Sequence, residues 1–216
     1  MKKYDTVIFD LDGTLLNTLE DLVDSVNFAL TLYGFPCRRM EDIRSFAGNG
    51  IARLIELAIP NGRNNPQYEK CLADFRFHYS KNMQNKTTAY DGIMELLDRL
   101  AKENFKIAIV SNKFDTAVKE LNQIYFKEYI KLAIGETKDV LKKPAPDMLF
   151  KAIEQLGSTV HETMYIGDSE VDVKTAKNSG VTSIGVTWGF RNREVLEQEG
   201  PDYIIDRPEE LLKIVS

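Results

Sequence analysis

The stretch that decides the fold is Thr6-Val7-Ile8-Phe9-Asp10-Leu11-Asp12-Gly13-Thr14-Leu15. Its first four residues form a short, continuous run rich in Val and Ile, which is typical of a strand covered on both faces. Residues two apart in an extended chain point the same way, so Asp10 and Asp12 would project together from the carboxyl end of this strand. That end of an open α/β sheet is where ligands bind. The stretch therefore predicts a buried strand that delivers two carboxylates to a ligand-binding edge.

The two aspartates have two interpretations. Carboxylates held close together repel each other unless a cation lies between them or one keeps its proton. Either state suits phosphoryl transfer, in which one carboxylate attacks phosphorus and the other handles protons. The alternative is an Asp-Gly turn whose aspartates are solvated flanks. The apolar strand in front of the pair favours the functional interpretation.

Similar apolar runs predict five more strands, at Lys106–Val110, Leu132–Ile134, Met164–Ile166, Thr182–Val186 and Tyr203–Ile205. Segments with helical spacing lie between them, for example at residues 93–100 and 148–156, and residues 208–215 close the chain as a short helix. Because strand and helix alternate, we expect an α/β fold with a Rossmann-like parallel sheet and helices on both sides.

The alternation breaks once, between the first strand and Lys106, where about ninety residues show helical patterns and no convincing strand. One helix is expected to begin near Thr18, a second after Gly50, and a third over about residues 67–83. This region predicts an inserted helical domain. The expected boundaries are a small helical cap domain at residues 16–87 within a core domain made of residues 1–15 and 88–216.

The composition sets limits on function. The chain has 216 residues, 43% of them hydrophobic and 28% charged, which is typical of a globular protein. A net charge of -5 without extended Lys/Arg clusters disfavours nucleic-acid and anionic-membrane partners. Cys37 and Cys71 show no metal-ligand spacing, no signal-peptide pattern opens the chain, and no apolar run approaches the ~20 residues of a membrane span. We expect a cytoplasmic protein with reduced cysteines.

Polar segments follow three of the later strands. Ser111-Asn112-Lys113 follows the second strand, where a hydroxyl and backbone N–H groups are placed to hold phosphoryl oxygens. The alternative is a helix cap. After the third strand, Pro144 and Pro146 stiffen the backbone that would carry Lys143 to the site as a fixed positive charge. The alternative for this segment is an exposed basic loop.

The fourth strand is followed by Gly167-Asp168-Ser169-Glu170-Val171-Asp172. Its carboxylates predict a magnesium site built from Asp10, the backbone carbonyl of Asp12, Asp168 and water. The alternative is that Asp168 caps the following helix. All four segments would meet at one edge of one sheet. Such a meeting of polar residues is not expected by chance and favours a functional site.

In this order and spacing, the four segments resemble the motifs of the haloacid dehalogenase superfamily of phosphatases, over essentially the whole chain. The resemblance implies a helical cap after the first motif, a nucleophile at Asp10, a general acid/base at Asp12, and catalytic roles for Ser111 and Lys143. It implies Mg²⁺ as cofactor, held by Asp10, Asp12 and Asp168 with Asp172 in support. The implied substrate contacts in the core are Thr14, Asn112 and Lys113.

Within that superfamily the chain looks most like phosphoglycolate phosphatases, through residues 44–50 of the expected cap and Ser111-Asn112-Lys113. Asn17 departs from the Asp that is common there. A closed cap would bring Arg44 and Asn49 over the site, and the planar fork of Arg suits a substrate carboxylate. The alternatives are a surface cation for Arg44 and a turn before a helix for Asn49.

The expected function is Mg²⁺-dependent hydrolysis of a small phosphorylated metabolite, phosphoglycolate being the candidate, through an aspartyl phosphate on Asp10. The enzymatic alternatives are an inorganic pyrophosphatase, a sugar-phosphate phosphatase or mutase, and a dehalogenase, which uses neither Mg²⁺ nor Asp12. The non-enzymatic alternative is a receiver-like signalling module that accepts a phosphate. A monomer and a homodimer are both compatible with the sequence.

Overall fold

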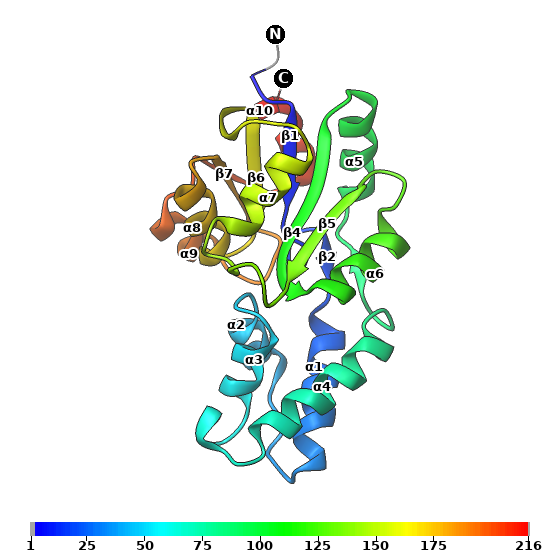
Figure 1. Cartoon of the computed structure of the whole chain (residues 1–216), viewed down its shortest axis with the longest axis vertical. Helices are drawn as coiled ribbons and strands as arrows, with labels where there is room; N and C mark the ends of the chain where they lie inside the picture. Colours follow the sequence, from blue (N-terminus) through cyan, green and yellow to red (C-terminus); the bar gives the residue numbers. More distant parts are fainter. Residues whose placement is uncertain (1–2, 216) are drawn as a thin grey trace. The chain divides into compact units, whose positions relative to one another are not determined.

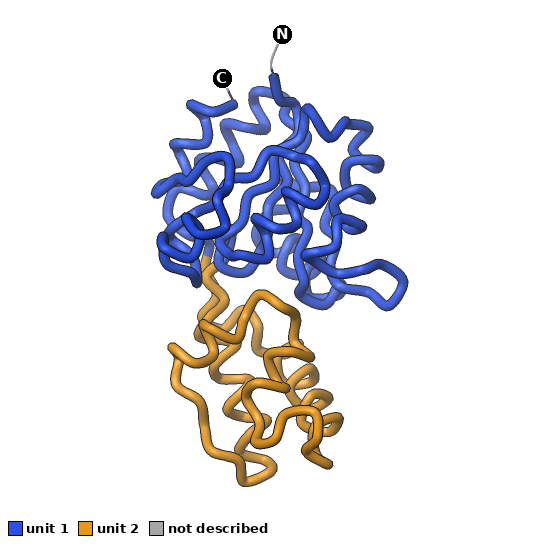
Figure 2. The backbone as a smooth tube through the Cα atoms, turned by 90° about the vertical axis from the view of Figure 1, so that its left-hand side faces the viewer, with its two compact units in different colours: residues 1–16, 89–216 blue, residues 17–88 orange. Residues whose placement is uncertain are grey.

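The computed structural model describes residues 3–215 and divides the chain into two compact units (Figure 2). Unit 1 is formed by Met1–Leu16 and Ala89–Ser216, and unit 2 by Asn17–Thr88. The chain therefore leaves unit 1 after its first strand and returns to it after about seventy residues.

Unit 1 is built on a six-stranded sheet in the order β5-β4-β1-β6-β7-β8, in which all neighbouring strands are parallel (Figure 1). Its strands are β1 (Thr6–Phe9), β4 (Lys106–Phe114), β5 (Leu132–Glu136), β6 (Thr163–Gly167), β7 (Thr182–Val186) and β8 (Tyr203–Ile205). Each contains one of the six apolar runs. The expected Rossmann-like α/β fold is confirmed.

Strand β1 lies at the centre of this sheet, with β4 on one side and β6 on the other. Phe9 at its end pairs with Ile109 of β4 and with Ile166 of β6. The chain moves outward from β1 to β4 and β5, then crosses back to continue with β6, so the topological switch point lies between β1 and β6. Ligands of such sheets bind at this point, beyond the carboxyl ends of the strands.

Six helices of unit 1 connect these strands or close the chain: α5 (Ile93–Lys102), α6 (Asp115–Tyr125), α7 (Asp147–Gln155), α8 (Glu170–Ser179), α9 (Arg193–Glu199) and α10 (Leu211–Val215). Single 3₁₀ turns at Val160–Glu162 and Pro208–Glu210 precede β6 and α10. Helices α7 and α8 cover one face of the sheet, where Met148 and Ala176 pack with Ile8, Val110 and Tyr165 in one buried cluster.

Unit 2 consists of helices α1 (Leu19–Leu32), α2 (Met40–Phe46), α3 (Ile51–Ala58) and α4 (Tyr68–Asn82), with a 3₁₀ turn at Gly62–Asn64. Apolar side chains at helical spacing, such as Leu22 and Val26 of α1 and Phe75 of α4, are buried in it. Two two-residue strands that the sequence did not suggest, β2 (Leu16–Asn17) and β3 (Thr88–Ala89), pair with each other where the chain passes between the units.

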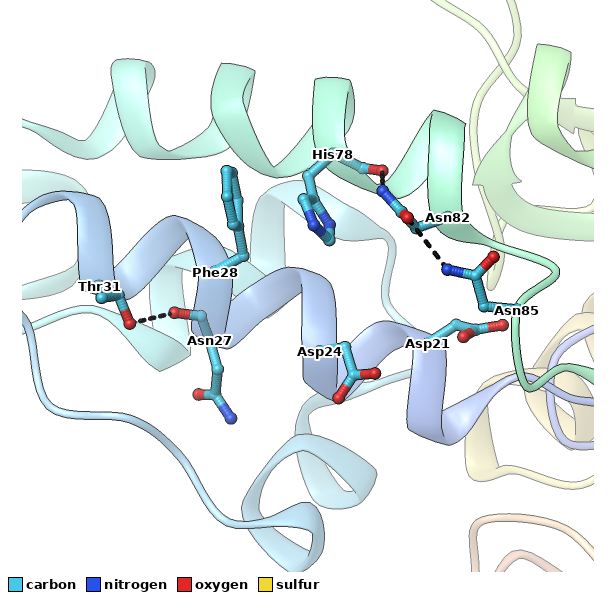
Figure 3. A pocket seen from close by; sticks show the side chains of 8 residues that line it. All are labelled: Asp21, Asp24, Asn27, Phe28, Thr31, His78, Asn82 and Asn85. Carbon is cyan, nitrogen blue, oxygen red and sulfur yellow. Dashed lines mark hydrogen bonds between the residues drawn. The ribbon is translucent and has the colours of Figure 1, made fainter.

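A polar pocket lies between α1 and α4 of unit 2, lined by Asp21, Asp24, Asn27, Phe28, Thr31, His78, Asn82 and Asn85 (Figure 3). The His78 ring stacks on Phe28 at 4.0 Å and contacts the Ser25 hydroxyl at 3.0 Å. The Asp21 carboxylate accepts hydrogen bonds from the backbone N–H groups of Lys86 and Thr87, so it ties α1 to the segment that leaves the unit. These contacts give the polar side chains a structural role.

Among the described residues, no helix has both the length and the apolar character that a membrane crossing requires.

Candidate active site

Asp10 follows β1 directly, at the centre of the sheet edge. Its backbone N–H donates to the carbonyl of Ile166 at 2.8 Å, so the parallel pairing with β6 continues one residue beyond the strand. The residue is 5% exposed, and its buried Oδ1 atom lies 3.0 Å from Nζ of Lys143. Because a carboxylate oxygen accepts about two hydrogen bonds, this atom has capacity left for a bound group.

Three carboxylates gather at this point. Asp10, Asp168 and Asp172 are all buried, and each offers an oxygen within 4.8 Å of the others. Asp168 follows β6, the neighbour of β1, and Asp172 lies in the first turn of α8. The topology thus brings residues far apart in sequence to the switch point of the sheet.

Asp172 has both oxygens occupied by protein groups. Its Oδ2 accepts from the backbone N–H and the hydroxyl of Ser169, at 3.1 and 2.6 Å. Its Oδ1 lies 2.7 Å from Nζ of Lys143 and 3.1 Å from the hydroxyl of Tyr165. Since a carboxylate oxygen accepts about two hydrogen bonds, Asp172 has little capacity left for a further ligand.

Lys143 is the cation of this cluster. Its Nζ lies 3.0 Å from Oδ1 of Asp10 and 2.7 Å from Oδ1 of Asp172, and the side chain is 2% exposed. Burial acts to lower its pKa, but the carboxylates of Asp10 and Asp172 outweigh this and raise the pKa of Lys143 to about 12. Lys143 is therefore positively charged beside Asp10. The Asn112 side chain holds the Lys143 backbone at both its carbonyl and its N–H.

The cluster holds three acidic side chains and one basic side chain, and the pKa values of Asp10 and Asp168 are raised. Burial raises the pKa of Asp10 to about 6, with Lys143 opposing and Asp172 and Asp12 adding to the rise. Burial, Asp172 and Asp10 raise the pKa of Asp168 well above its usual value. Three carboxylates against one ammonium carry an excess of negative charge, which a divalent cation would neutralise. The donor set therefore fits a hard metal ion such as Mg²⁺.

The segment at residues 188–190 forms hydrogen bonds to Asp168 and to the first motif. The backbone N–H of Phe190 donates to Oδ2 of Asp168 at 2.6 Å, and Nε1 of Trp188 donates to the carbonyl of Thr14 at 3.0 Å. A Cβ at Gly189 would lie 2.3 Å from both Cβ of Asp168 and the carbonyl oxygen of Gly13. Only glycine allows this approach. The hydrogen bond from Phe190 to Asp168 ties this segment to the carboxylate cluster.

The Asp12 side chain contacts Lys113 and is not part of the cluster of Asp10, Asp168 and Asp172. Its Oδ1 and Oδ2 lie 2.8 and 3.1 Å from Nζ of Lys113, which is buried. Ser111 is buried too, and its hydroxyl accepts from the N–H of Lys113 at 3.4 Å. Thr14 is fully buried, and its hydroxyl has no partner in the part of the chain that the structure describes.

The two candidate residues of the expected cap belong to unit 2. Arg44 lies in the last turn of α2, and Asn49 lies in the loop that precedes α3. Their role in substrate binding stays a prediction.

Tyr165 is a buried polar residue at this site that was not identified from the sequence. It lies in β6, and its hydroxyl contacts Lys143 and Asp172. The sequence did carry a signal for it: a tyrosine within a strand predicted to be buried on both faces needs a hydrogen-bond partner for its hydroxyl.

Comparison with known proteins places the chain in a class. The model of the haloacid dehalogenase-like hydrolase family matches residues 7–186. The chain belongs to this family of hydrolases. It is similar to phosphoglycolate phosphatases, of which that of Pseudomonas putida is 31% identical over 206 residues, 93% of this chain and 75% of the relative. The phosphoglycolate phosphatase of Agrobacterium fabrum is 33% identical over 208 residues, 92% of this chain and 87% of the relative.

Solved structures agree with this placement. A crystal structure from Lactobacillus delbrueckii subsp. bulgaricus has a TM-score of 0.93 at 33% identity and covers 100% of this chain and 99% of its own. A predicted phosphoglycolate phosphatase from Haemophilus somnus has a TM-score of 0.93 at 26% identity, with 100% of both chains covered. The expected enzyme class, a phosphatase of the haloacid dehalogenase type, is confirmed.

Proposed function

We propose that this chain hydrolyses a small phosphate monoester in a Mg²⁺-dependent reaction that proceeds through a phosphoryl group on Asp10. The observation that carries the proposal is the buried cluster of Asp10, Asp168 and Asp172 beside Lys143, at the switch point of a parallel sheet. Oδ1 of Asp10, which contacts Lys143, has capacity left for a bound group at that point.

The chemistry has two halves. In the first, a carboxylate oxygen of Asp10 attacks phosphorus, the bond from phosphorus to the leaving oxygen breaks, and protonated Asp12 gives that oxygen its proton. In the second, the Asp12 carboxylate takes a proton from water, the water oxygen attacks phosphorus, and the bond to Asp10 breaks. The products are the alcohol and inorganic phosphate.

The residues around Asp10 position the phosphoryl group. Lys143 is a fixed positive charge 3.0 Å from the Asp10 carboxylate, so it would neutralise charge on an attached phosphoryl group. Strand β4, the other neighbour of β1, runs on to Phe114, so Ser111 lies inside it and not in the turn expected after Val110. Its pairing with β5 is irregular between Val110 and Phe114, and Ser111 with the N–H groups of this stretch would hold phosphoryl oxygens. Positioning and electrostatics of this kind supply most of the rate in phosphoryl transfer.

Residues Asp10 and Asp168 and the backbone carbonyl of Asp12 would hold Mg²⁺. Asp172 would support them from behind, since both its oxygens bind protein groups. When bound, Mg²⁺ supplies electrostatic stabilisation of the transferring phosphoryl group.

Phosphoglycolate is the proposed substrate, because relatives at 31% and 33% identity bear the name phosphoglycolate phosphatase. Arg44 would bind its carboxylate, with Asn49 beside it. Inorganic pyrophosphate and sugar phosphates are the competing substrates that a panel should include.

The test is turnover of phosphoglycolate, other phosphate monoesters and pyrophosphate, with and without Mg²⁺, by wild type and Asp10→Asn. We expect turnover only with Mg²⁺, and a loss of about 10⁴-fold or more in Asp10→Asn. Asp98→Asn, which changes an exposed aspartate of α5, serves as the control. Normal turnover by folded Asp10→Asn would contradict the nucleophilic role of Asp10. Equal turnover of all the esters would contradict only the proposal that phosphoglycolate is the substrate. A long-lived aspartyl phosphate without turnover would indicate a receiver-like module.

A further inference from the structure

Tyr165 occupies an unusual place for a tyrosine. It lies in the middle of β6, where it pairs with Ile8 of β1, and it is 1% exposed. Its side chain belongs to the apolar cluster that packs beneath α7 and α8. Its hydroxyl nevertheless lies 2.9 Å from the carbonyl oxygen of Val110 in β4. Because β1 separates β6 from β4, the ring reaches across the central strand of the sheet.

The hydroxyl meets three polar groups there. Besides the Val110 carbonyl, it lies 2.8 Å from Nζ of Lys143 and 3.1 Å from Oδ1 of Asp172. An ammonium group only donates, so the hydroxyl accepts from Lys143 and gives its single proton to Val110 or Asp172. Phenylalanine would fill the same apolar space, so packing does not explain the hydroxyl.

The contact determines how the Lys143 protons are shared. Of its three ammonium protons, hydrogen bonds to Tyr165 and Asp172 use two. The third is left for the Asp10 carboxylate, 3.0 Å away, or for a group attached to it. Since the three protons of an ammonium group have a fixed tetrahedral arrangement, fixing two of them also fixes the direction of the third.

From this geometry we propose that Tyr165 is a positioning residue: its hydroxyl orients the Lys143 ammonium so that one N–H stays directed at the phosphoryl group on Asp10. The proposal rests on the proposed function of the site. Tyr165 itself lies behind Lys143 and acts through it. Without the hydroxyl, Lys143 would keep its two carboxylate partners and lose the neutral partner that Tyr165 provides, so its ammonium would turn towards the carboxylates and away from the phosphoryl position.

The experiment compares Tyr165→Phe with wild type and with Tyr68→Phe. Phenylalanine keeps the ring, whose centre lies 5.4 Å from Nζ of Lys143, and removes the hydroxyl alone. Tyr68 is the matched control: it is also buried, and its hydroxyl donates to the backbone carbonyl of Ala52 at 2.9 Å within unit 2. Two quantities are measured well below the melting temperature: the Mg²⁺-dependent kinetics on a phosphate monoester, and the affinity for inorganic phosphate by calorimetry.

We expect Tyr165→Phe to lower kcat by about 10- to 100-fold, the usual effect of removing a partner behind a ligand group, with KM changed far less. The affinity for inorganic phosphate should fall as well, while Tyr68→Phe stays at wild-type values in both. A kcat and a phosphate affinity within about twofold of wild type would overturn the proposal, because such a change is below the range for a supporting partner. An activity loss that merely follows the folded fraction, with unchanged phosphate affinity, would also overturn it. If wild type hydrolyses no ester, the proposed function fails, and the calorimetric comparison alone decides the role of Tyr165.

Discussion

Nζ of Lys113 lies between the two carboxylate oxygens of Asp12, at 2.8 and 3.1 Å. Both groups sit at the sheet edge, and the lysine side chain is 2% exposed. The two aspartates of the first motif therefore have different lysine partners: Asp10 contacts Lys143, and Asp12 contacts Lys113. Lys113 therefore holds the Asp12 carboxyl group through both of its oxygens and fixes its orientation.

Replacing Lys113 by Met tests what its contact with Asp12 contributes to catalysis. We expect kcat/KM to fall by about 10²-fold, mostly through kcat, because Asp12 loses the group that orients it. The measurement is steady-state kinetics on the best ester of the panel. Lys102→Met removes the same charge from an exposed Lys102–Asp98 pair at 2.6 Å and should leave the kinetics unchanged. A raised KM with normal kcat would show that Lys113 serves substrate binding only.

Gly189 should tolerate no side chain. A methyl group there would lie 2.3 Å from Cβ of Asp168 and from the Gly13 carbonyl, so Gly189→Ala must push the segment at residues 188–190 away. We expect a loss of about 1–3 kcal/mol in the free energy of unfolding, as for other overpacked sites, together with weaker Mg²⁺ binding. Chemical denaturation and calorimetry measure the two effects.

Gly185→Ala provides the control for that change, since its methyl group would meet Leu196 and Pro201 at no less than 3.4 Å. It should bind Mg²⁺ like wild type. Equal Mg²⁺ affinity in Gly189→Ala would show that the loop does not hold Asp168 in place.

The sequence predicted the elements whose signal is local. Strands β1, β7 and β8 begin and end where their apolar runs do, because a buried strand needs such a run. Helices α2 and α9 were not predicted, since each has seven residues and buries only one of them, Ile43 or Leu196, and so shows no apolar stripe.

The residues of the candidate site were likewise predictable only where the sequence carries a local signal. Asp10, Lys143 and Asp168 could be grouped from the sequence because each follows a strand, and parallel strands end at a common edge. The Tyr165 hydroxyl and the Phe190 backbone N–H could not, because the first reaches its partners across a strand and the second is a group that every residue except proline carries. Such contacts follow from three-dimensional packing, which no spacing rule describes.

Two aspartates of helix α1 in unit 2 should differ sharply in their effect on stability (Figure 3). Asp21 is 2% exposed and accepts from the N–H of Lys86 and from the N–H and hydroxyl of Thr87. Asp21→Ala would remove the acceptor of these three hydrogen bonds, two of which are buried, so we expect a loss of about 3 kcal/mol in the free energy of unfolding. Asp24 forms an exposed ion pair with Lys86, and Asp24→Ala should cost far less. Equal effects in denaturant titrations would contradict the role given to Asp21.

Mg²⁺ should stabilise the protein more as the pH rises from 5 to 7. In the metal-free protein, burial raises the pKa of Asp10 from its usual 3.8 to about 6, and that of Asp168 is raised as well. A carboxyl group whose pKa is raised by folding binds more protons in the folded state, so its contribution to stability is present at low pH and is lost as the pH rises through about 6. Mg²⁺ binds only the deprotonated carboxylates and must displace those protons at pH 5.

The melting temperature at a fixed millimolar Mg²⁺ concentration, minus that in chelator, measures this effect at each pH. We expect a difference that is small at pH 5 and grows towards pH 7, and a difference near zero at every pH in Asp168→Asn, which keeps the size of the side chain and loses its charge. Asp98→Asn should follow wild type, because Asp98 lies on the exposed face of α5. A shift that is equal at both pH values would mean that Mg²⁺ binds without displacing protons from these carboxylates, and hence at a place other than the cluster of Asp10, Asp168 and Asp172.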